Sequence, residues 1–308
     1  MEVLSKVKHG YVIILVIALA GFLLPIEAYC QLPDFHNVQL RGNQGSGSNS
    51  AKLVILNFDD TNMDQIGYVK PILDKYGFKA TFFPVCGWIH SQAGWQALAE
   101  LQKDGMDIQS HTMTHPNLNR LSAAQLDYEI GQPKQCLLSH AINTTIFAYP
   151  YGAGSNNATV VNTVAKYYNL ARTATYSDSV YTATFEDRYS INSWVPLHIE
   201  GPYDYGDLSC KDGCRYYDDS QLFERFVEEV NNQNNYNKDG TIRAIPIVVY
   251  HGFVPYDNIS EKKIPTDTSV NLFNREMKYL YDNGFKVLTM ADLGYDESSN
   301  SLYVKSRS

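Results

Sequence analysis

Short apolar runs alternate with stretches of helical periodicity from residue 51 onward. The run Lys52–Phe58 is rich in β-branched residues, and a second run follows at residues 79–85. Between them, apolar side chains recur every three or four residues, which predicts a helix with Pro71 at a late start or at a kink. The first unit of the folded region is therefore predicted to be β-α-β.

The same alternation continues to the end of the chain. Further strands are predicted at residues 106–110, 145–149, 170–175, 245–250 and 285–288, and helices at 95–103, 122–139, 156–168, 221–233 and 270–282. This pattern predicts an α/β fold with a mostly parallel sheet and outer helices, either a barrel or an open sheet. In such folds the functional side chains lie at the carboxyl ends of the strands.

The first 28 residues are predicted to be a targeting segment rather than part of the fold. Lys6 and Lys8 precede an almost purely apolar run at residues 11–24, and Ala28 follows. This pattern predicts a secretory signal peptide (1–28) cleaved after Ala28, with an uncleaved membrane anchor as the alternative. Either places the rest of the chain outside the cytoplasm, secreted or anchored to the outer face of the membrane.

Composition changes from residue 29 onward and sets the expected domain limits. Residues 29–50 are predicted to be a flexible linker because the stretch 41–50 is rich in Gly and Ser. The catalytic domain is predicted to span residues 51–296, and residues 297–308 to form a C-terminal tail. One domain is expected, since barrels commonly use such a length as a single unit.

Charge excludes one class of partner. The formal net charge is -8 and the sequence contains no basic cluster, so a nucleic-acid partner is not expected. Tyr is unusually frequent, with 23 copies. Its rings suit both sugar faces and half-buried cores, so this count alone selects neither function. The oligomeric state does not follow from the sequence.

Five cysteines fit an oxidising compartment. Cys210 and Cys214 flank a turn-prone Asp-Gly, which favours a small disulfide loop over a metal clip because no second Cys or His pair is near in sequence. A Cys86–Cys136 bond is an open alternative that spacing does not decide. Cys30 is then the unpaired residue.

Polar residues follow several of the predicted strands. Asp59 and Asp60 end the first strand, His111 and His115 follow the third, and His251 ends the strand at residues 245–250. One helical turn would bring two imidazoles four residues apart to the same side, which is the spacing that a metal needs. With a carboxylate from Asp60 they form a two-His, one-carboxylate set, which leaves coordination positions open for water and substrate.

The two adjacent aspartates invite a second interpretation. An Asp after a strand often caps the next helix or forms a turn. Thr61 or Asp64 offers the same capping group, so that role does not require both aspartates. Consecutive side chains diverge, and we therefore expect one Asp to bind metal while the other faces the substrate.

Four ordered motifs resemble those of the NodB-type polysaccharide deacetylases, carbohydrate esterase family 4. They are Phe58-Asp59-Asp60, Ser110-His111-Thr112-Met113-Thr114-His115, Phe147-Ala148-Tyr149-Pro150-Tyr151-Gly152 and Val249-Tyr250-His251. The resemblance extends from about residue 51 to residue 292. It implies a distorted (β/α) barrel of the NodB homology type and hydrolysis of an N-acetyl amide, or less often an O-acetyl ester, on a polysaccharide or oligosaccharide.

The resemblance also implies roles for individual residues. Asp60, His111 and His115 would hold a divalent metal, usually Zn, that polarises the acetyl carbonyl and acidifies water. Asp59 would be the general base. The backbone N–H of Tyr151 would stabilise the oxyanion, and His251 would protonate the leaving amine.

Departures from the family pattern keep a second function open. Ala148 stands where the family usually has an Arg that supports the catalytic Asp, Thr61 replaces a common Gly, and the fourth motif around Trp194 lacks its Asp. Arg172, on the next predicted strand, is a candidate for the missing charge, although a purely structural Arg fits the pattern too. The sequence predicts a secreted or membrane-anchored metal-dependent deacetylase. The alternative is a catalytically impaired barrel that acts as a carbohydrate-binding or scaffolding protein.

Overall fold

The first predicted strand forms β1 (Leu53–Asp59), and all seven of its residues are buried. Its side chains alternate between two layers. Leu53 and Ile55 pack in one hydrophobic cluster, whereas Val54, Leu56 and Phe58 pack in another. A strand that is covered on both faces reads as a continuous apolar run, which is why the sequence pattern here is unbroken.

The computed structural model describes residues 51–174, 187–204, 209–210, 212–238, 241–255 and 264–306. Gly47–Ser308 form one compact unit. The predicted signal or anchor segment, the linker and Cys30 lie outside the described residues. In the described ranges, no helix combines the length and apolar character needed to cross a bilayer.

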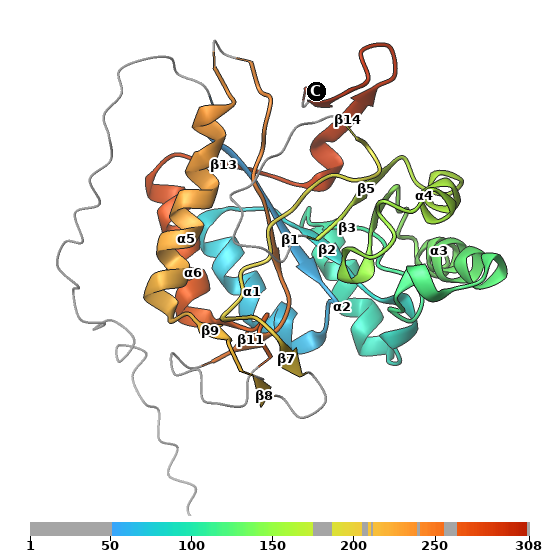
Figure 1. Cartoon of the computed structure of the whole chain (residues 1–308), viewed down its shortest axis with the longest axis horizontal. Helices are drawn as coiled ribbons and strands as arrows, with labels where there is room; N and C mark the ends of the chain where they lie inside the picture. Colours follow the sequence, from blue (N-terminus) through green and yellow to red (C-terminus); the bar gives the residue numbers. More distant parts are fainter. Residues whose placement is uncertain are drawn as a thin grey trace, which may run out of the picture. The chain divides into compact units, whose positions relative to one another are not determined.

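The strands around β1 are parallel to it. β1 pairs with β2 (Thr81–Phe83), β10 (Ile247–Tyr250) and β13 (Lys286–Leu288), and β2 pairs with β3 (Asp107–Ile108). A second parallel pair consists of β4 (Ile146–Ala148) and β5 (Leu170–Arg172). Figure 1 shows β1, β2 and β3 at the centre of the described residues, with helices around them.

Three single parallel bridges join these two sets of strands. Ser110 pairs with Phe147, Arg172 with Ile191, and Trp194 with Val248. Followed in order, the pairings run from β1 through β2, β3, β4 and β5 to residues 191–194, and then to β10 and back to β1. The ring is thus closed but irregular, because single bridges replace ladders at three places. The predicted fold class, a distorted (β/α) barrel, is confirmed.

Six helices of at least eight residues cover the barrel in the described ranges. They are α1 (Met63–Tyr76), α2 (Gln92–Lys103), α3 (Ala123–Leu138), α4 (Ala158–Ala165), α5 (Asp219–Asn232) and α6 (Val270–Asp282). The last matches its predicted bounds. α1 starts earlier than its apolar pattern indicated, because the Asn62 side chain caps it by accepting from the backbone N–H of Gln65 at 2.8 Å. Helices α1, α5 and α6 lie side by side on one flank, and α3 and α4 on the other (Figure 1).

Short antiparallel pairs of strands lie outside the main sheet in the described residues. β6 (Ile199–Glu200) pairs with β9 (Arg215–Tyr216), and β7 (Tyr203–Asp204) with β8 (Ser209–Cys210). β11 (Phe253–Val254) and β12 (Thr268–Ser269) form a short parallel pair.

The sulfur atoms of Cys210–Cys214 and of Cys86–Cys136 lie at disulfide distance, with Cα separations of 6.1 and 6.5 Å. The predicted Cys210–Cys214 pairing is therefore present, and so is the Cys86–Cys136 pairing that spacing left open.

The end of the chain differs from the predicted tail. β14 (Leu293–Asp296) pairs with β15 (Ser301–Val304) in an antiparallel hairpin, so the predicted boundary at residue 296 falls inside this element. Leu293 and Leu302 pack in the cluster that contains Leu53 and Ile55. The polar run at residues 296–301 is the hairpin loop rather than the start of a tail.

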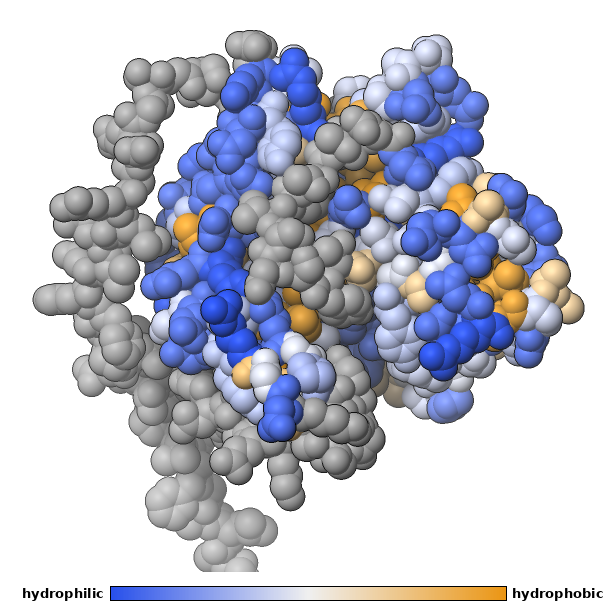
Figure 2. All heavy atoms as spheres, in the orientation of Figure 1, coloured by the Kyte–Doolittle hydropathy of each residue, from blue (hydrophilic) through white to orange (hydrophobic). Residues whose placement is uncertain are grey.

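The surface that Figure 2 presents is mainly hydrophilic over the described residues, with small apolar spots. Among the large apolar side chains that are exposed, Trp88 and Tyr151 are 48% and 58% accessible. Both belong to segments at the carboxyl end of the barrel, in η2 (Cys86–Trp88) and η4 (Pro150–Gly152). The predicted polar residues lie at this same end.

Candidate active site

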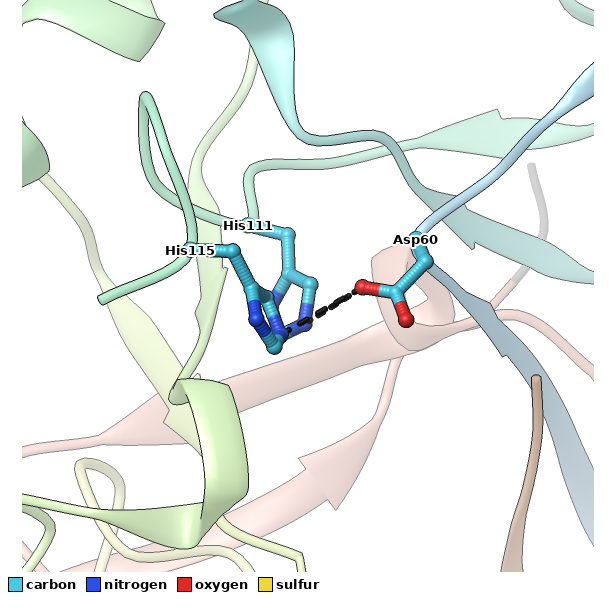
Figure 3. A group of neighbouring side chains, drawn as sticks. All are labelled: Asp60, His111 and His115. Carbon is cyan, nitrogen blue, oxygen red and sulfur yellow. Dashed lines mark ion pairs between the residues drawn. The ribbon is translucent and has the colours of Figure 1, made fainter. Parts of the chain in front are cut away.

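Three side chains predicted as metal ligands converge at the end of β1. The Oδ1 atom of Asp60 lies 3.6 Å from Nε2 of His111 and 3.3 Å from Nε2 of His115. One potential ligand atom from each residue lies within 4.8 Å of the other two. Figure 3 shows both imidazole rings, carried by one loop after β3, turned toward the Asp60 carboxylate.

The loop at residues 111–115 reaches this arrangement without a helix. Thr112 and His115 have φ angles of 67° and 63°, in the left-handed region, and the backbone N–H of His115 donates to Thr112 Oγ1 at 2.9 Å. The prediction that a helical turn aligns the two histidines is therefore wrong. Asp60 and Tyr151 also have positive φ angles, 63° and 58°. Such conformations are costly for residues with a side chain and are concentrated at functional sites.

A buried carboxylate on α3 holds the same loop. Glu129 Oε2 accepts from the backbone N–H groups of Met113 and Thr114 at 3.1 and 2.8 Å, and Oε1 accepts from Thr114 Oγ1 at 2.7 Å. A charged acceptor strengthens these bonds. Glu129 thus fixes the backbone between the two histidines, a role for which its place in a predicted helix gave no sign.

The imidazoles present the atoms that a metal needs. Nδ1 of His111 lies 2.9 Å from the carbonyl oxygen of Ala148, which only accepts, so Nδ1 carries the hydrogen and the lone pair of Nε2 faces Asp60. Nδ1 of His115 lies 3.1 Å from the hydroxyl of Tyr151. Burial lowers the pKa of His111 to about 4, and burial together with the His111 charge lowers the pKa of His115 to about 3. Both rings are therefore neutral near pH 7, as ligands must be.

Asp60 completes a donor set that fits a divalent cation. Burial and the neighbouring Asp59 charge raise the pKa of Asp60 to about 7. Its Oδ1 atom is buried and has no hydrogen-bond donor in the described part of the chain. A cation between this oxygen and the two Nε2 atoms would compensate that buried charge, because carboxylate and neutral imidazole are common ligands of zinc and related metals.

Asp59 lies on the inner face of the barrel next to Arg172. The guanidinium of Arg172 is fully buried, donates from Nη2 to Asp59 Oδ1, and lies 4.6 Å from the centre of the Phe83 ring. Its Nε donates to the side-chain oxygen of Asn57 at 3.2 Å in the amide orientation that satisfies both groups. Arg172 is the register partner of Ala148 in the β4–β5 pair. The charge expected at position 148 is thus supplied from the adjacent strand.

The surroundings of the two aspartates shift their pKa values in opposite directions. Burial raises the pKa of Asp59, but the charges of Arg172, His111 and His251 outweigh it and hold that pKa below its usual value. Asp59 Oδ2 lies 3.9 Å from Nε2 of His251, whose pKa burial lowers to about 4. The result is an ionised carboxylate beside a neutral imidazole, a base and a proton carrier in contact range.

A cleft of about 410 Å³ opens beside these residues. Its lining includes Asp60 and His251 together with Trp88, Met63 and Ile264. The exposed rings of Trp88 and Tyr151 lie 5.4 and 4.6 Å from the His115 ring. Trp194, which the sequence left as either a cleft wall or a core residue, is buried in the hydrophobic core.

Part of the chain is similar in sequence to known polysaccharide deacetylases. Residues 46–170 match the family described as polysaccharide deacetylase. The chain is 36% identical over 108 residues to "Putative polysaccharide deacetylase YxkH" of Bacillus subtilis (strain 168), covering 33% of this chain and 38% of that protein. It is 28% identical over 116 residues to "Bifunctional xylanase/deacetylase" of Pseudobutyrivibrio xylanivorans, covering 37% of this chain and 19% of that protein. The match thus spans well under two thirds of each relative.

A solved structure supports the fold alone. The crystal structure of a mutant of BA3943, a CE4 family pseudoenzyme with restored enzymatic activity, superposes with a TM-score of 0.50 at 16% identity. The match covers 80% of this chain and 68% of that one. At this identity the similarity concerns the arrangement of strands and helices.

Proposed function

We propose, from the match of residues 46–170 to the polysaccharide deacetylase family, that this chain is a metal-dependent hydrolase that removes acetyl groups from an N-acetylated polysaccharide or oligosaccharide. The observation that carries the proposal is the joint placement of two groups at the carboxyl end of the barrel, beside a cleft that Asp60 and His251 line. A metal-type donor set, Asp60 with His111 and His115, lies beside the Asp59–His251 pair. Hydrolysis of an amide needs both.

Asp60, His111 and His115 would hold the divalent metal, and one carboxylate with two imidazoles favours Zn²⁺. When bound, such an ion polarises the acetyl carbonyl and lowers the pKa of water. The low pKa of Asp59 keeps its carboxylate ready to accept a proton from the attacking water. The backbone N–H of Tyr151 donates to the oxygen on which charge develops.

His251 completes the proton path. An amine leaves an amide only when it is protonated, and a neutral imidazole must first receive the proton that it delivers. Nε2 of His251 lies 3.9 Å from Asp59 Oδ2. The proton that Asp59 takes from water therefore has a short route through His251 to the leaving nitrogen.

The alternative of a carbohydrate-binding barrel without turnover rested on the missing Arg at position 148 and on the missing Asp of the fourth motif. Arg172 contacts Asp59 from the neighbouring strand, so the first of these reasons no longer favours the alternative. For location, the apolar run at residues 11–24 supports export, with the chain secreted or anchored through its N-terminal segment.

Metal content and acetate release test the proposal together. We expect the purified chain to hold about one divalent ion and to release acetate from N-acetylated glycans. His111→Ala removes a ligand and loses the ion. Asp59→Asn keeps the ion and lowers kcat by about 10²- to 10⁴-fold, because only the base is lost.

The matched control is His140→Ala, because His140 is exposed and packs on Trp95 away from the site. It should keep both metal and activity. Full metal occupancy in His111→Ala would refute the ligand assignment, and normal turnover in Asp59→Asn would refute the base.

A further inference from the structure

Gln65 lies in the first turn of α1, and only 1% of the residue is accessible to solvent. Its side-chain Nε2 donates to two backbone carbonyls, those of Asp59 at 3.0 Å and His251 at 2.6 Å. Gln65 and His251 are 186 residues apart in sequence. One amide thus contacts the main chain of both the base and the proton carrier.

These two hydrogen bonds lie just beyond the last residue pair between β1 and β10. The register between these strands runs from Ile55–Ile247 to Phe58–Tyr250. Asp59 is the next residue of β1, and His251 directly follows β10. Their carbonyl oxygens both accept and neither donates, so they form no bond with each other. A primary amide has two N–H groups on one nitrogen and can satisfy both oxygens at once.

The bridge matters because the two side chains act across a short gap. Asp59 Oδ2 and His251 Nε2 are 3.9 Å apart. In each residue the Cα atom that carries the side chain is bonded directly to the bridged carbonyl carbon. A displacement of about 1 Å between reacting groups costs about 10²-fold in rate. Losing the bridge removes a cross-link between the two segments that carry these side chains.

We propose that Gln65 is a positioning residue that bridges the main chains of Asp59 and His251 and thereby sets the spacing of the base and the proton carrier. The inference rests on the proposed function, since that function gives these two residues their roles. Gln65 itself touches neither substrate nor metal ligand in this assignment. Its contribution should therefore appear in turnover rather than in metal or substrate binding.

The chain offers a matched control at the opposite end of β1. Gln233 is also 1% accessible, accepts from the backbone N–H of Leu53 at 2.9 Å, and donates to the carbonyls of Leu53 and Val230 at 2.8 and 2.7 Å. It is a buried glutamine bonded to the same strand, far along that strand from Asp59. Replacing it loses similar bonds without touching the site.

The experiment compares Gln65→Met, Gln65→Asn and Gln233→Met in the full chain. Methionine fills similar space without donors, and asparagine keeps the amide but is one methylene too short to reach both carbonyls. In both Gln65 variants we expect kcat to fall about 10- to 100-fold with KM within about twofold of wild type and unchanged metal content. Gln233→Met should lower the unfolding temperature but keep kcat within about twofold.

Several outcomes overturn the inference. Wild-type kcat in a folded Gln65→Met or Gln65→Asn protein does so, and so does an equal kcat loss in Gln233→Met. Absence of acetate release by the wild type would instead refute the proposed function. The bridge is then tested by the crystal structure of Gln65→Asn, in which the distance between Asp59 Oδ2 and His251 Nε2 should exceed 3.9 Å. An unchanged distance would refute it.

Discussion

The two faces of the strands beneath the site differ sharply. Toward the interior, β1 and β5 contribute Asn57, Asp59 and Arg172, all buried, with Arg172 donating to both of the others. Toward the helices, the same level of the barrel is filled by aromatic rings with centroids 4.8 to 6.1 Å apart. These rings belong to Phe58, Phe82, Tyr250, Phe253 and Phe273.

The two faces are expected to contribute differently, the outer face to the stability of the fold and the inner face to the chemistry of the site. A buried ion pair such as Asp59–Arg172 contributes little net stability, because removing two charges from water costs about as much as their attraction returns. The aromatic layer contributes through buried area and through ring pairs worth roughly 0.5–1.5 kcal/mol each. We therefore expect the outer face to stabilise the strands on which the inner face acts.

The largest effect should follow from Arg172→Met on the inner face. This change leaves the Asp59 carboxylate buried without its counter-charge, which costs about 3–5 kcal/mol of unfolding free energy. Turnover should fall by at least about 100-fold, because the pKa of Asp59 rises and the base loses its support. Urea unfolding and acetate release measure the two effects.

A double variant checks the physical reason. Adding Asp59→Asn to Arg172→Met removes the unpaired charge, so stability should recover while turnover stays low. If the double variant is as unstable as Arg172→Met, the loss comes from packing on Phe83 instead.

A smaller effect, of the opposite kind, is expected from Phe273→Ala on the outer face. Phe273 on α6 makes T-shaped contacts with Phe58, Tyr250 and Phe253. Its truncation should lower the unfolding free energy by about 3 kcal/mol while kcat of the folded protein stays within about threefold. A kcat loss as large as that of Arg172→Met would break the separation between the faces.

The smallest effect concerns a carboxyl group within the outer layer. Glu276 accepts from the Tyr250 hydroxyl at 2.7 Å, and burial raises the pKa of Glu276 to about 8. The folded protein therefore keeps a proton that the unfolded chain releases above its ordinary pKa of 4.5. Stability from this group is complete at low pH and is lost as the pH rises from about 4.5 to about 8.

Glu276→Gln should remove this dependence, since glutamine accepts the same hydroxyl without titrating. We expect the stability of the wild type relative to the variant to fall by about 2 kcal/mol between pH 6 and pH 8, as measured by urea unfolding at several pH values. A difference that is constant over this range would contradict the assigned protonation state.

The sequence predicted those parts of the fold that repeat a local pattern. α6 lies where its apolar periodicity placed it, β4 and β10 lie within their predicted runs, and β1 extends one residue beyond its run. Closure of the ring was not predictable, because two of its three single bridges involve Ile191 and Trp194, in a segment without a strand pattern. The β14–β15 hairpin was missed because its loop is polar and resembles a chain end.

For the site, the positions at strand ends were predictable and the supporting groups were not. The rule that function gathers at the carboxyl ends of strands singled out Asp59, Asp60 and His251, while their roles stay predictions. Glu129 and Gln65 gave no sign, because they act on backbone groups that only the tertiary structure brings near. Arg172 was considered but not chosen, since its relation to Ala148 appears only in the β4–β5 register.

Closure of the ring has a consequence for the time that the chain needs to fold. β1 is among the first elements to leave the ribosome, yet one of its partners, β10, follows about 190 residues later. Contacts so distant in sequence carry a large loop-closure entropy and fold slowly. Until β10 docks, β1 lacks one neighbour and Asp59 does not have His251 beside it, so the pairing of β10 with β1 both closes the ring and assembles the proposed acid–base pair.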